Sequence, residues 1–177
     1  WADLSEGSYG VSLMNDCKYG YSMKDRVMTQ TLIKSGTEPN LTADQEEHSF
    51  TYSLYPHAGT WREAGTVQEA LNLNVPAKAV FGAAEKDRME FLSADKRNVV
   101  LETVKKAEDG DGMIVRLYEV ENARTKVTLH CAESILSAEE TNLLEQPADG
   151  AIDVKENEIS LTIKPYEIRT IRIRTEK

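Results

Sequence analysis

The sequence predicts a mainly β fold, an antiparallel β-sandwich with one short helix. Apolar and polar residues alternate in many short segments, turn-forming residues separate these segments at spacings of about ten residues, and a single segment has helical periodicity. The chain of 177 residues is long enough for one hydrophobic core, or for two small cores that share an interface.

Strand character begins near the N-terminus. Three segments with period-two alternation are expected to be strands: 9–14, 28–33 and 49–55. In the third segment, Phe50, Tyr52 and Leu54 share one face. The polar stretch 35–48 is long for a connection in a compact domain, and long loops are often functional or mobile.

The segment 60–74 is the predicted helix. Thr60 is a suitable N-cap and Glu63 follows three residues later, which is the capping-box pattern. Val67, Ala70 and Leu71 then form an apolar stripe at helical spacing. Pro76 ends the pattern, so the helix is expected to stop near residue 74.

Strands separated by turns are expected to fill the C-terminal half. The predicted segments are 89–94, 98–105, 113–120, 125–131, 135–144, 158–164 and 167–174. The turn sequence at 109–112, Asp-Gly-Asp-Gly, predicts a β-hairpin over 98–120. The apolar phase shifts between Ile168 and Ile171, which suggests a β-bulge. The stretch 83–90 is the candidate seam between the two strand groups.

The composition excludes several classes of function. The net charge is −9 and the pI is near 4.9, which argues against nucleic acid or an anionic membrane as a partner. No segment approaches the roughly 18 consecutive apolar residues that a membrane span needs. The two cysteines, Cys17 and Cys131, are expected to be free thiols in a reducing compartment.

No metal site is expected in this chain. None of the three histidines, His48, His57 and His130, has a carboxylate two positions later, and no pair has ligand spacing on one element. His130 and Cys131 are neighbours on a predicted strand, so their side chains point to opposite faces and cannot bind one ion together.

No nucleophile is convincing either. Lys18 could activate Cys17, with His48 or His57 as the base. However, a lone cysteine after a strand is more often a packed, inert thiol, and that is the expectation for Cys17. Catalytic residues are therefore expected to be absent.

The N-terminal half combines side-chain types that suit a carbohydrate. The segments are 15–21 (NDCKYGY), 44–48 (DQEEH) and 52–57 (YSLYPH). Aromatic faces stack on sugar rings, whereas carboxylates and amides hydrogen-bond hydroxyl groups. The pattern also fits the polar edge of a sandwich with half-buried tyrosines, which the pattern alone favours, and both interpretations stay open at this point.

Several long motifs carry a family resemblance. WADLSEGSYGVSLMNDCKYGYS and ADQEEHSFTYSLYPHAGTW resemble the C-terminal β-rich region of glycoside hydrolase family 38 α-mannosidases, the zinc-dependent class II type. FLSADKRNVVLETVKKAEDGDGMIVRLYE, AEETNLLEQP and IKPYEIRTIRIR resemble the closing strands of the same family. The resemblance covers essentially all of residues 1–177, which would form the C-terminal β-sandwich region.

The resemblance implies an activity for the intact enzyme. Family members are retaining exo-α-mannosidases that form a covalent mannosyl-enzyme on an aspartate. A zinc ion held by two His and two Asp contacts the sugar, and these residues belong to an N-terminal domain whose motifs are missing here. The resemblance thus implies that the chain alone is inactive and holds no cofactor. Trp1 is not an initiator Met, which fits a piece of a longer protein. The resemblance implies that this protein is cytoplasmic.

The resemblance also implies a supporting role at the substrate cleft. The positions that match the family's cleft loops are Asn15, Asp16, Lys18, Tyr19, Asp44 and His48. They are expected to bind the mannose-containing oligosaccharide beyond the cleaved bond, while the domain packs on the catalytic domain of the same chain. The alternative is a stand-alone carbohydrate-binding or protein-interaction β-sandwich module.

Overall fold

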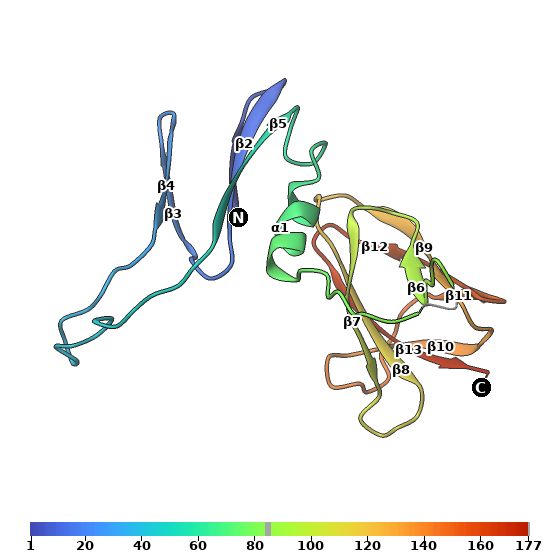
Figure 1. Ribbon diagram of the computed structural model, residues 1–177. Coiled ribbons are helices and arrows are strands. Elements are labelled where there is room, and N and C mark those ends of the chain that lie inside the picture. Colours follow the sequence, from blue (N-terminus) through green and yellow to red (C-terminus); the bar gives the residue numbers. More distant parts are fainter. Residues whose placement is uncertain (84–85, 177) are drawn as a thin grey trace. The chain divides into compact units, whose positions relative to one another are not determined.

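The computed structural model describes residues 1–83 and 86–176, and it divides the chain into two compact units (Figure 1). The N-terminal unit consists of residues 1–81 and the C-terminal unit of residues 82–177. The predicted seam at 83–90 adjoins this division. Its residues 84–85 lie outside the described residues, and the seam stays a prediction.

The C-terminal unit is a β-sandwich of two antiparallel sheets, which confirms the predicted fold class. One sheet has the order β10-β13-β8-β7 and the other has the order β11-β12-β9-β6. The strand bounds are β6 Leu92–Ala94, β7 Val99–Lys106, β8 Met113–Glu119, β9 Thr125–Cys131, β10 Ile135–Thr141, β11 Asp153–Lys155, β12 Glu158–Ile163 and β13 Ile168–Thr175.

Alternation along these strands builds the core of the C-terminal unit. Every second residue of β8, β9, β12 and β13 points inward, because successive side chains of a strand alternate between faces. Most of the inward side chains are aliphatic, and with Val99 of β7 the buried members of the core are Val115, Leu117, Val127, Leu129, Ile159, Leu161, Ile163, Ile171 and Ile173. The two sheets thereby bury each other's apolar faces, and this half of the molecule has a complete core.

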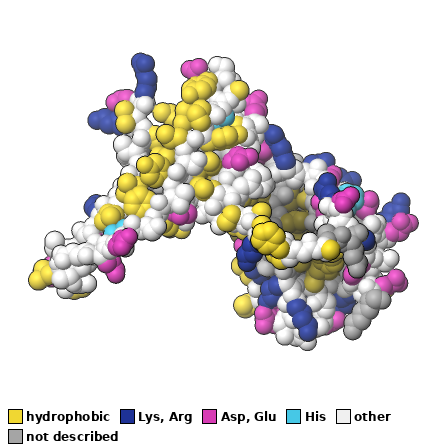
Figure 2. Space-filling view, viewed as in Figure 1, with side chains coloured by type: hydrophobic (Ala, Val, Ile, Leu, Met, Phe, Trp, Pro, Cys, Tyr) yellow, Lys and Arg dark blue, Asp and Glu magenta, His cyan; other side chains and the backbone are white. Residues whose placement is uncertain are grey.

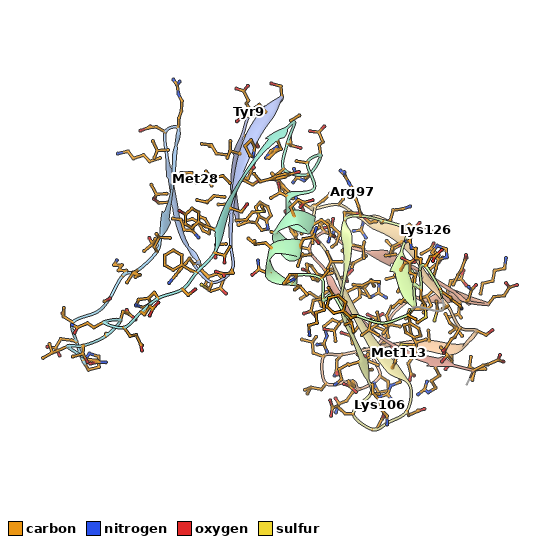
Figure 3. All side chains as sticks on the ribbon, viewed as in Figure 1. Tyr9, Met28, Arg97, Lys106, Met113 and Lys126 are labelled. Atoms are coloured by element: carbon orange, nitrogen blue, oxygen red, sulfur yellow. The ribbon has the colours of Figure 1, made fainter. Side chains whose placement is uncertain are left out.

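The hairpin predicted over 98–120 is confirmed by the antiparallel pairing of β7 with β8. Figure 3 labels Lys106 and Met113, which pair across the hairpin next to its turn. Within the turn, the Asp109 carboxylate accepts a hydrogen bond from the Asp111 amide at 2.9 Å. Gly110 and Gly112 have φ angles of 79° and 86°, a conformation that favours glycine.

The β-bulge predicted within 167–174 is wrong. The pairing of β13 with β8 runs without interruption from Ile168 to Ile173. The apolar phase shifts because Arg169 takes an inward position at the end of the sandwich. Its guanidinium donates to both carboxylate oxygens of Glu140, with Nε to Oε1 at 2.6 Å, and Nη1 donates to the Thr162 carbonyl at 2.8 Å. A buried ion pair therefore replaces an apolar residue, and the strand stays regular.

The N-terminal unit contains a sheet, a hairpin and a helix (Figure 1). The sheet has the order β1-β2-β5 and the hairpin pairs β3 with β4. The bounds are β1 Ala2–Ser5, β2 Tyr9–Asn15, β3 Gly20–Lys24, β4 Val27–Thr31, β5 Tyr52–Ala58 and α1 Thr66–Asn74. The sequence pattern did not predict β1 and β3, nor β11 in the other unit, all of which have five or fewer residues.

The predicted start of the helix at residue 60 is wrong, although the predicted capping box forms. The Thr60 amide donates to the Glu63 carboxylate at 2.8 Å. Gly65 then adopts a left-handed conformation with φ of 68°, and α1 begins only at Thr66. The box therefore caps a separate turn at 60–65, and the left-handed residue separates this turn from the helix. The predicted end at residue 74 is confirmed.

Candidate functional site

The turn after β2 holds four of the six residues expected to line the cleft. Asn15 is buried, its side-chain oxygen accepts a hydrogen bond from the Lys18 amide, and its side-chain nitrogen donates to the Tyr21 hydroxyl. Its backbone carbonyl accepts a hydrogen bond from the Asn74 side chain of α1 at 3.0 Å. Asn15 therefore shapes the turn and anchors it, and its polar atoms are engaged within the unit.

Asp16 joins the turn to the end of the long loop. Its carboxylate accepts a hydrogen bond from the Thr51 amide at 3.0 Å, and its own amide donates to the Thr51 carbonyl at 3.1 Å. Hydrogen bonds from the Cys17 thiol and the Thr51 amide lower the pKa of Asp16. The carboxylate is thus ionised at neutral pH and fixes the point at which the long loop joins β5.

Lys18 and Tyr19 are better placed to meet a ligand. The Lys18 ammonium lies 4.9 Å from the centroid of the Phe50 ring, a cation–π contact. The Tyr19 side chain is 85% exposed. A cation, an aromatic ring and an exposed phenol on neighbouring loops are side-chain types that contact sugar hydroxyl groups and ring faces.

Asp44 and His48 lie together on the long loop. The His48 ring nitrogen Nε2 lies 3.0 Å from the Asp44 carbonyl oxygen, and Asp44 has a φ of 57°. Just before them, the Asn40 side chain accepts hydrogen bonds from the Thr42 amide and hydroxyl at 3.0 and 2.9 Å. Within the part of the chain that the structure describes, no hydrogen bond or ion pair joins Asp44 or His48 to the turn at 15–19.

Cys17 is an exposed free thiol, so the expectation of a packed thiol is wrong. Its side chain follows the strand into the turn, where it donates to Asp16 instead of entering a core. That hydrogen bond raises the pKa of the Cys17 thiol, which makes the thiolate scarcer at neutral pH. The environment of Cys17 is thus the opposite of that of an activated nucleophile. Cys131 is also a free thiol, as expected.

The described residues offer no candidate metal site. No group of three or more His, Cys, Asp or Glu side chains in residues 1–83 and 86–176 is arranged to hold a metal ion. His130 is exposed and lies 3.2 Å from Glu158, whereas Cys131 beside it is buried, so the two point to opposite faces. Also within these residues, no helix is long and apolar enough to cross a membrane.

The sequence pattern missed a buried polar network in the N-terminal unit. Asp3 accepts hydrogen bonds at 2.7 Å from Ser12 and from the His57 ring, and Ser12 also lies 2.8 Å from the Thr66 hydroxyl. Burial acts to raise the pKa of Asp3, but hydrogen bonds from Ser5, His57 and Ser12 outweigh it and lower the pKa. Ser12 is fully buried and contacts Asp3 instead of His57, so the network lacks the serine–histidine bond of a hydrolase triad.

The C-terminal unit has an open groove beside the Arg169–Glu140 pair, with a volume of about 660 Å³. Its lining carries charges of both signs, including Arg124, Lys126 and Asp149. None of the described residues that line it is aromatic, so it offers no ring for stacking on a sugar. The groove therefore fits a carbohydrate less well than the loops of the N-terminal unit.

Two family models match the chain. The "Glycosyl hydrolases family 38 C-terminal beta sandwich domain" matches residues 98–171, and the "Glycosyl hydrolases family 38 C-terminal domain" matches residues 1–42. The first match lies in the C-terminal unit and the second in the N-terminal unit. Together they take in well over half of the chain.

Curated relatives and solved structures point the same way. The chain is 36% identical to alpha-mannosidase 2C1 of Mus musculus and 37% identical to alpha-mannosidase G of Dictyostelium discoideum, with 97% of this chain covered in each case. It spans only 17% and 16% of these two proteins. A crystal structure of a glycosyl hydrolase family 38 protein from Enterococcus faecalis matches with a TM-score of 0.74 at 22% identity, over 97% of this chain and 22% of that one. This likeness confirms the fold. The two family models place the chain in the C-terminal region of glycosyl hydrolase family 38.

Proposed function

We propose that the chain is the accessory C-terminal part of a retaining exo-α-mannosidase that removes terminal α-linked mannose from oligosaccharides. The observation that carries the proposal is the similarity to proteins named alpha-mannosidase along 97% of the chain, at 36% and 37% identity. All of residues 1–177 would belong to this region, with a boundary near 83–90.

Catalysis is assigned to a part of the enzyme outside this chain. The described residues do not fit the set of two His and two Asp that holds zinc in this family, because no such cluster exists among them. The proposal therefore places zinc and the nucleophile in a separate catalytic domain. The chain would stabilise that domain and help to form the wall of its substrate cleft.

The proposed contacts with the sugar differ in kind among the six cleft residues. Lys18 and Tyr19 would contact the oligosaccharide directly, because one is a cation beside an aromatic ring and the other is largely exposed. Asn15 and Asp16 would position the turn that carries Lys18 and Tyr19, since the side chains of Asn15 and Asp16 already bond the backbone. Asp44 and His48 would contribute from the long loop.

A cytoplasmic location is part of the proposal. It is supported by the two free thiols, Cys17 and Cys131, because unpaired cysteines are usual in a reducing compartment. Neither nucleic acid nor a membrane is proposed as a partner, since a net charge of −9 disfavours both polyanionic surfaces.

Hydrolysis of an aryl α-mannoside tests the division of labour. The 177-residue chain and the longer polypeptide that includes a catalytic domain are assayed side by side, with added zinc. We expect turnover by the longer polypeptide and none by the chain alone. Turnover by the chain alone at the rate of the longer polypeptide would contradict the proposal.

Substitutions in the longer polypeptide test the role of the loops. Asp16→Ala removes the bond to the Thr51 amide that positions the turn, and His48→Ala removes a side chain of the long loop; each should weaken transition-state binding by about 1–3 kcal/mol. Gln45→Ala is the matched control on the loop, since its side chain bonds the Leu41 carbonyl at 3.2 Å. Wild-type kinetics in both variants, with folding intact, would make the loops purely structural.

A further inference from the structure

The sheet β1-β2-β5 has an apolar face that the described residues leave largely uncovered. Residues that pair across neighbouring strands share a face, so the register defines the members of this open face. They are Ala2, Leu4, Tyr9, Val11, Leu13, Asn15, Tyr52, Leu54, Pro56 and Ala58, of which all but the buried Asn15 are apolar or aromatic. No charged side chain is among them.

Exposure on the open face is high. Leu54 is 65% exposed and Tyr52 is 58% exposed, whereas Leu13, the partner of Leu54 in the register, is buried. The β3–β4 hairpin lies next to Leu13 at one end of the face, since the Tyr21 hydroxyl donates to the Leu13 carbonyl at 3.3 Å. Figure 2 shows hydrophobic side chains gathered along β2 and β5, and Figure 3 labels Tyr9 on β2.

The opposite face of the same sheet is covered, and apart from the buried Met14 it is mainly polar. On this face Asp3 accepts hydrogen bonds from Ser12 and His57, and Ser12 also lies within hydrogen-bond distance of the Thr66 hydroxyl of α1. Tyr55 on this face donates to the Ala64 carbonyl in the turn before α1, at 3.1 Å. Antiparallel sheets with one wet face normally bury the apolar face and expose the polar one. Here the arrangement is reversed, so the open face has the composition of a core without a second layer.

We propose that the open face docks on the remaining polypeptide of the same mannosidase, the part that lies outside these 177 residues. This proposal rests on the proposed function. The matched stretch is only 16–17% of the mannosidases of mouse and Dictyostelium, so more than four fifths of such a protein is available as the occupant. The occupant presents a complementary apolar surface, since a polar or charged surface would leave exposed side chains such as Tyr9, Tyr52 and Leu54 in contact with water.

A second copy of the chain is the competing occupant, and two observations disfavour it. Each copy carries a net charge of −9, so two copies repel each other. A surface on the same polypeptide also binds at an effective concentration of about a millimolar or more, which a separate copy does not reach. Docking within one polypeptide therefore outcompetes dimer formation.

Hydroxyl-radical footprinting of unmodified protein tests the proposal. Oxidation of Tyr52 is compared between the 177-residue chain and the longer polypeptide. Tyr166 of the C-terminal unit is the matched control, because it is the same residue type and is 59% exposed against 58% for Tyr52. We expect Tyr52 oxidation to fall at least about fivefold in the longer polypeptide, as expected for the dry centre of an interface, with less than about a twofold change at Tyr166.

Two results would overturn the proposal. Equal oxidation of Tyr52 in both proteins would show that the open face stays free. Protection of Tyr52 that is already present in the 177-residue chain and disappears on dilution would identify a second copy as the occupant. The mannoside assay on the same longer polypeptide separates the two proposals. Protection without turnover contradicts the proposed function, whereas turnover without protection contradicts the docking.

A charge on the open face provides an independent readout. Leu54→Glu is compared with Leu136→Glu on β10, a leucine of nearly equal exposure at 63%. In the longer polypeptide L54E should lower the melting temperature by several degrees more than L136E, because it buries a carboxylate without a partner. In the 177-residue chain neither variant should lower it. If L54E lowered the melting temperature of the 177-residue chain but not that of the longer polypeptide, docking on the longer polypeptide would be contradicted.

Discussion

The two units of this chain bury opposite kinds of surface. In the C-terminal unit, two sheets enclose aliphatic side chains such as Leu117 and Ile173, which are fully buried. In the N-terminal unit, the covered face of the sheet is mainly polar and the apolar face carries the exposed Leu54. The C-terminal unit therefore has the construction of an independent domain, whereas the N-terminal unit has that of one layer of a larger structure.

The two units are stabilised by different kinds of interaction. Burial of apolar surface stabilises the C-terminal sandwich, since each buried Leu or Ile side chain contributes about 1.5–3 kcal/mol. The N-terminal unit buries fewer apolar side chains, among them Met14 and Ala70, and its sheet adds hydrogen bonds from Ser12 and His57 to Asp3, each of which contributes only about 0.5–1.5 kcal/mol net. The five predictions that follow test this contrast, from the largest expected effect to the smallest.

Truncating one leucine in each unit should have unequal effects in the 177-residue chain. Leu117→Ala should lower the free energy of unfolding of the C-terminal unit by about 3–4 kcal/mol, because it leaves a cavity in a closed core. Leu54→Ala should change the stability of the N-terminal unit by less than about 0.5 kcal/mol, as for other exposed sites. Urea unfolding followed by far-UV circular dichroism measures both. Equal losses would remove the proposed difference between the units.

The buried carboxylate of Glu119 should be a sensitive polar group of the C-terminal unit. It accepts hydrogen bonds from the Asn98 side chain at 2.9 Å and from the amides of Glu121 and Tyr166 at 2.7 and 3.0 Å. Glu119→Gln should cost about 2–3 kcal/mol, because the amide nitrogen that it introduces faces donors. Asp153→Asn on an exposed site of β11 is the control, and it should leave the stability unchanged.

The pH dependence of Glu119 follows from its pKa. Burial acts to raise this pKa, but the amides of Tyr166 and Glu121 and the side chain of Asn98 outweigh it, so the pKa lies below its ordinary value of 4.5. The carboxylate therefore contributes stability that is fully present above pH 4.5 and is lost as the pH falls through the folded-state pKa. The Gln variant should lack this acid-dependent loss. The same slope in wild type and variant would contradict the assignment.

Breaking the polar network of the N-terminal unit should have a moderate effect. Ser12→Ala removes hydrogen bonds to Asp3 and Thr66 and should cost about 1–2 kcal/mol. Tryptophan fluorescence isolates this unit, because the only two tryptophans of the sequence, Trp1 and Trp61, both lie in it. Ser53→Ala on the same face of the sheet is the control. If both variants unfold at the same urea concentration as wild type, the network does not stabilise the sheet.

The smallest effect on stability is expected at Tyr19. Its side chain is 85% exposed, so Tyr19→Ala should change the free energy of unfolding by less than about 0.5 kcal/mol. In the longer polypeptide the same change should raise KM for an oligomannoside several-fold while leaving it unchanged for a small aryl mannoside. A change of equal size for both substrates would remove Tyr19 from the part of the cleft beyond the cleaved bond.

Much of the fold could be predicted because alternation is a strong signal in long strands. β8, β9 and β12 each have six or seven residues, and their period-two patterns located them. β1 and β11 have four and three residues, which is too short for a pattern to be significant. The bulge was misassigned because an arginine on a strand is normally taken to point outward, whereas Arg169 points inward towards Glu140.

The candidate site could be predicted less completely. The turn at 15–19 was found from its residue types, but those types do not distinguish a group that binds a ligand from one that bonds the backbone. Asn15 and Asp16 proved to bond the backbone of their own unit. The reversed sheet was beyond prediction, since alternation shows which residues share a face and not which face is covered.

Native-state hydrogen exchange of the 177-residue chain tests the contrast between the units most directly. The amides of β2 and β5 are compared with those of β8 and β13 as urea is added. We expect the N-terminal amides to lose protection at a lower urea concentration, because one face of their sheet lacks a partner. Loss of protection in a single transition shared by all four strands would contradict this account.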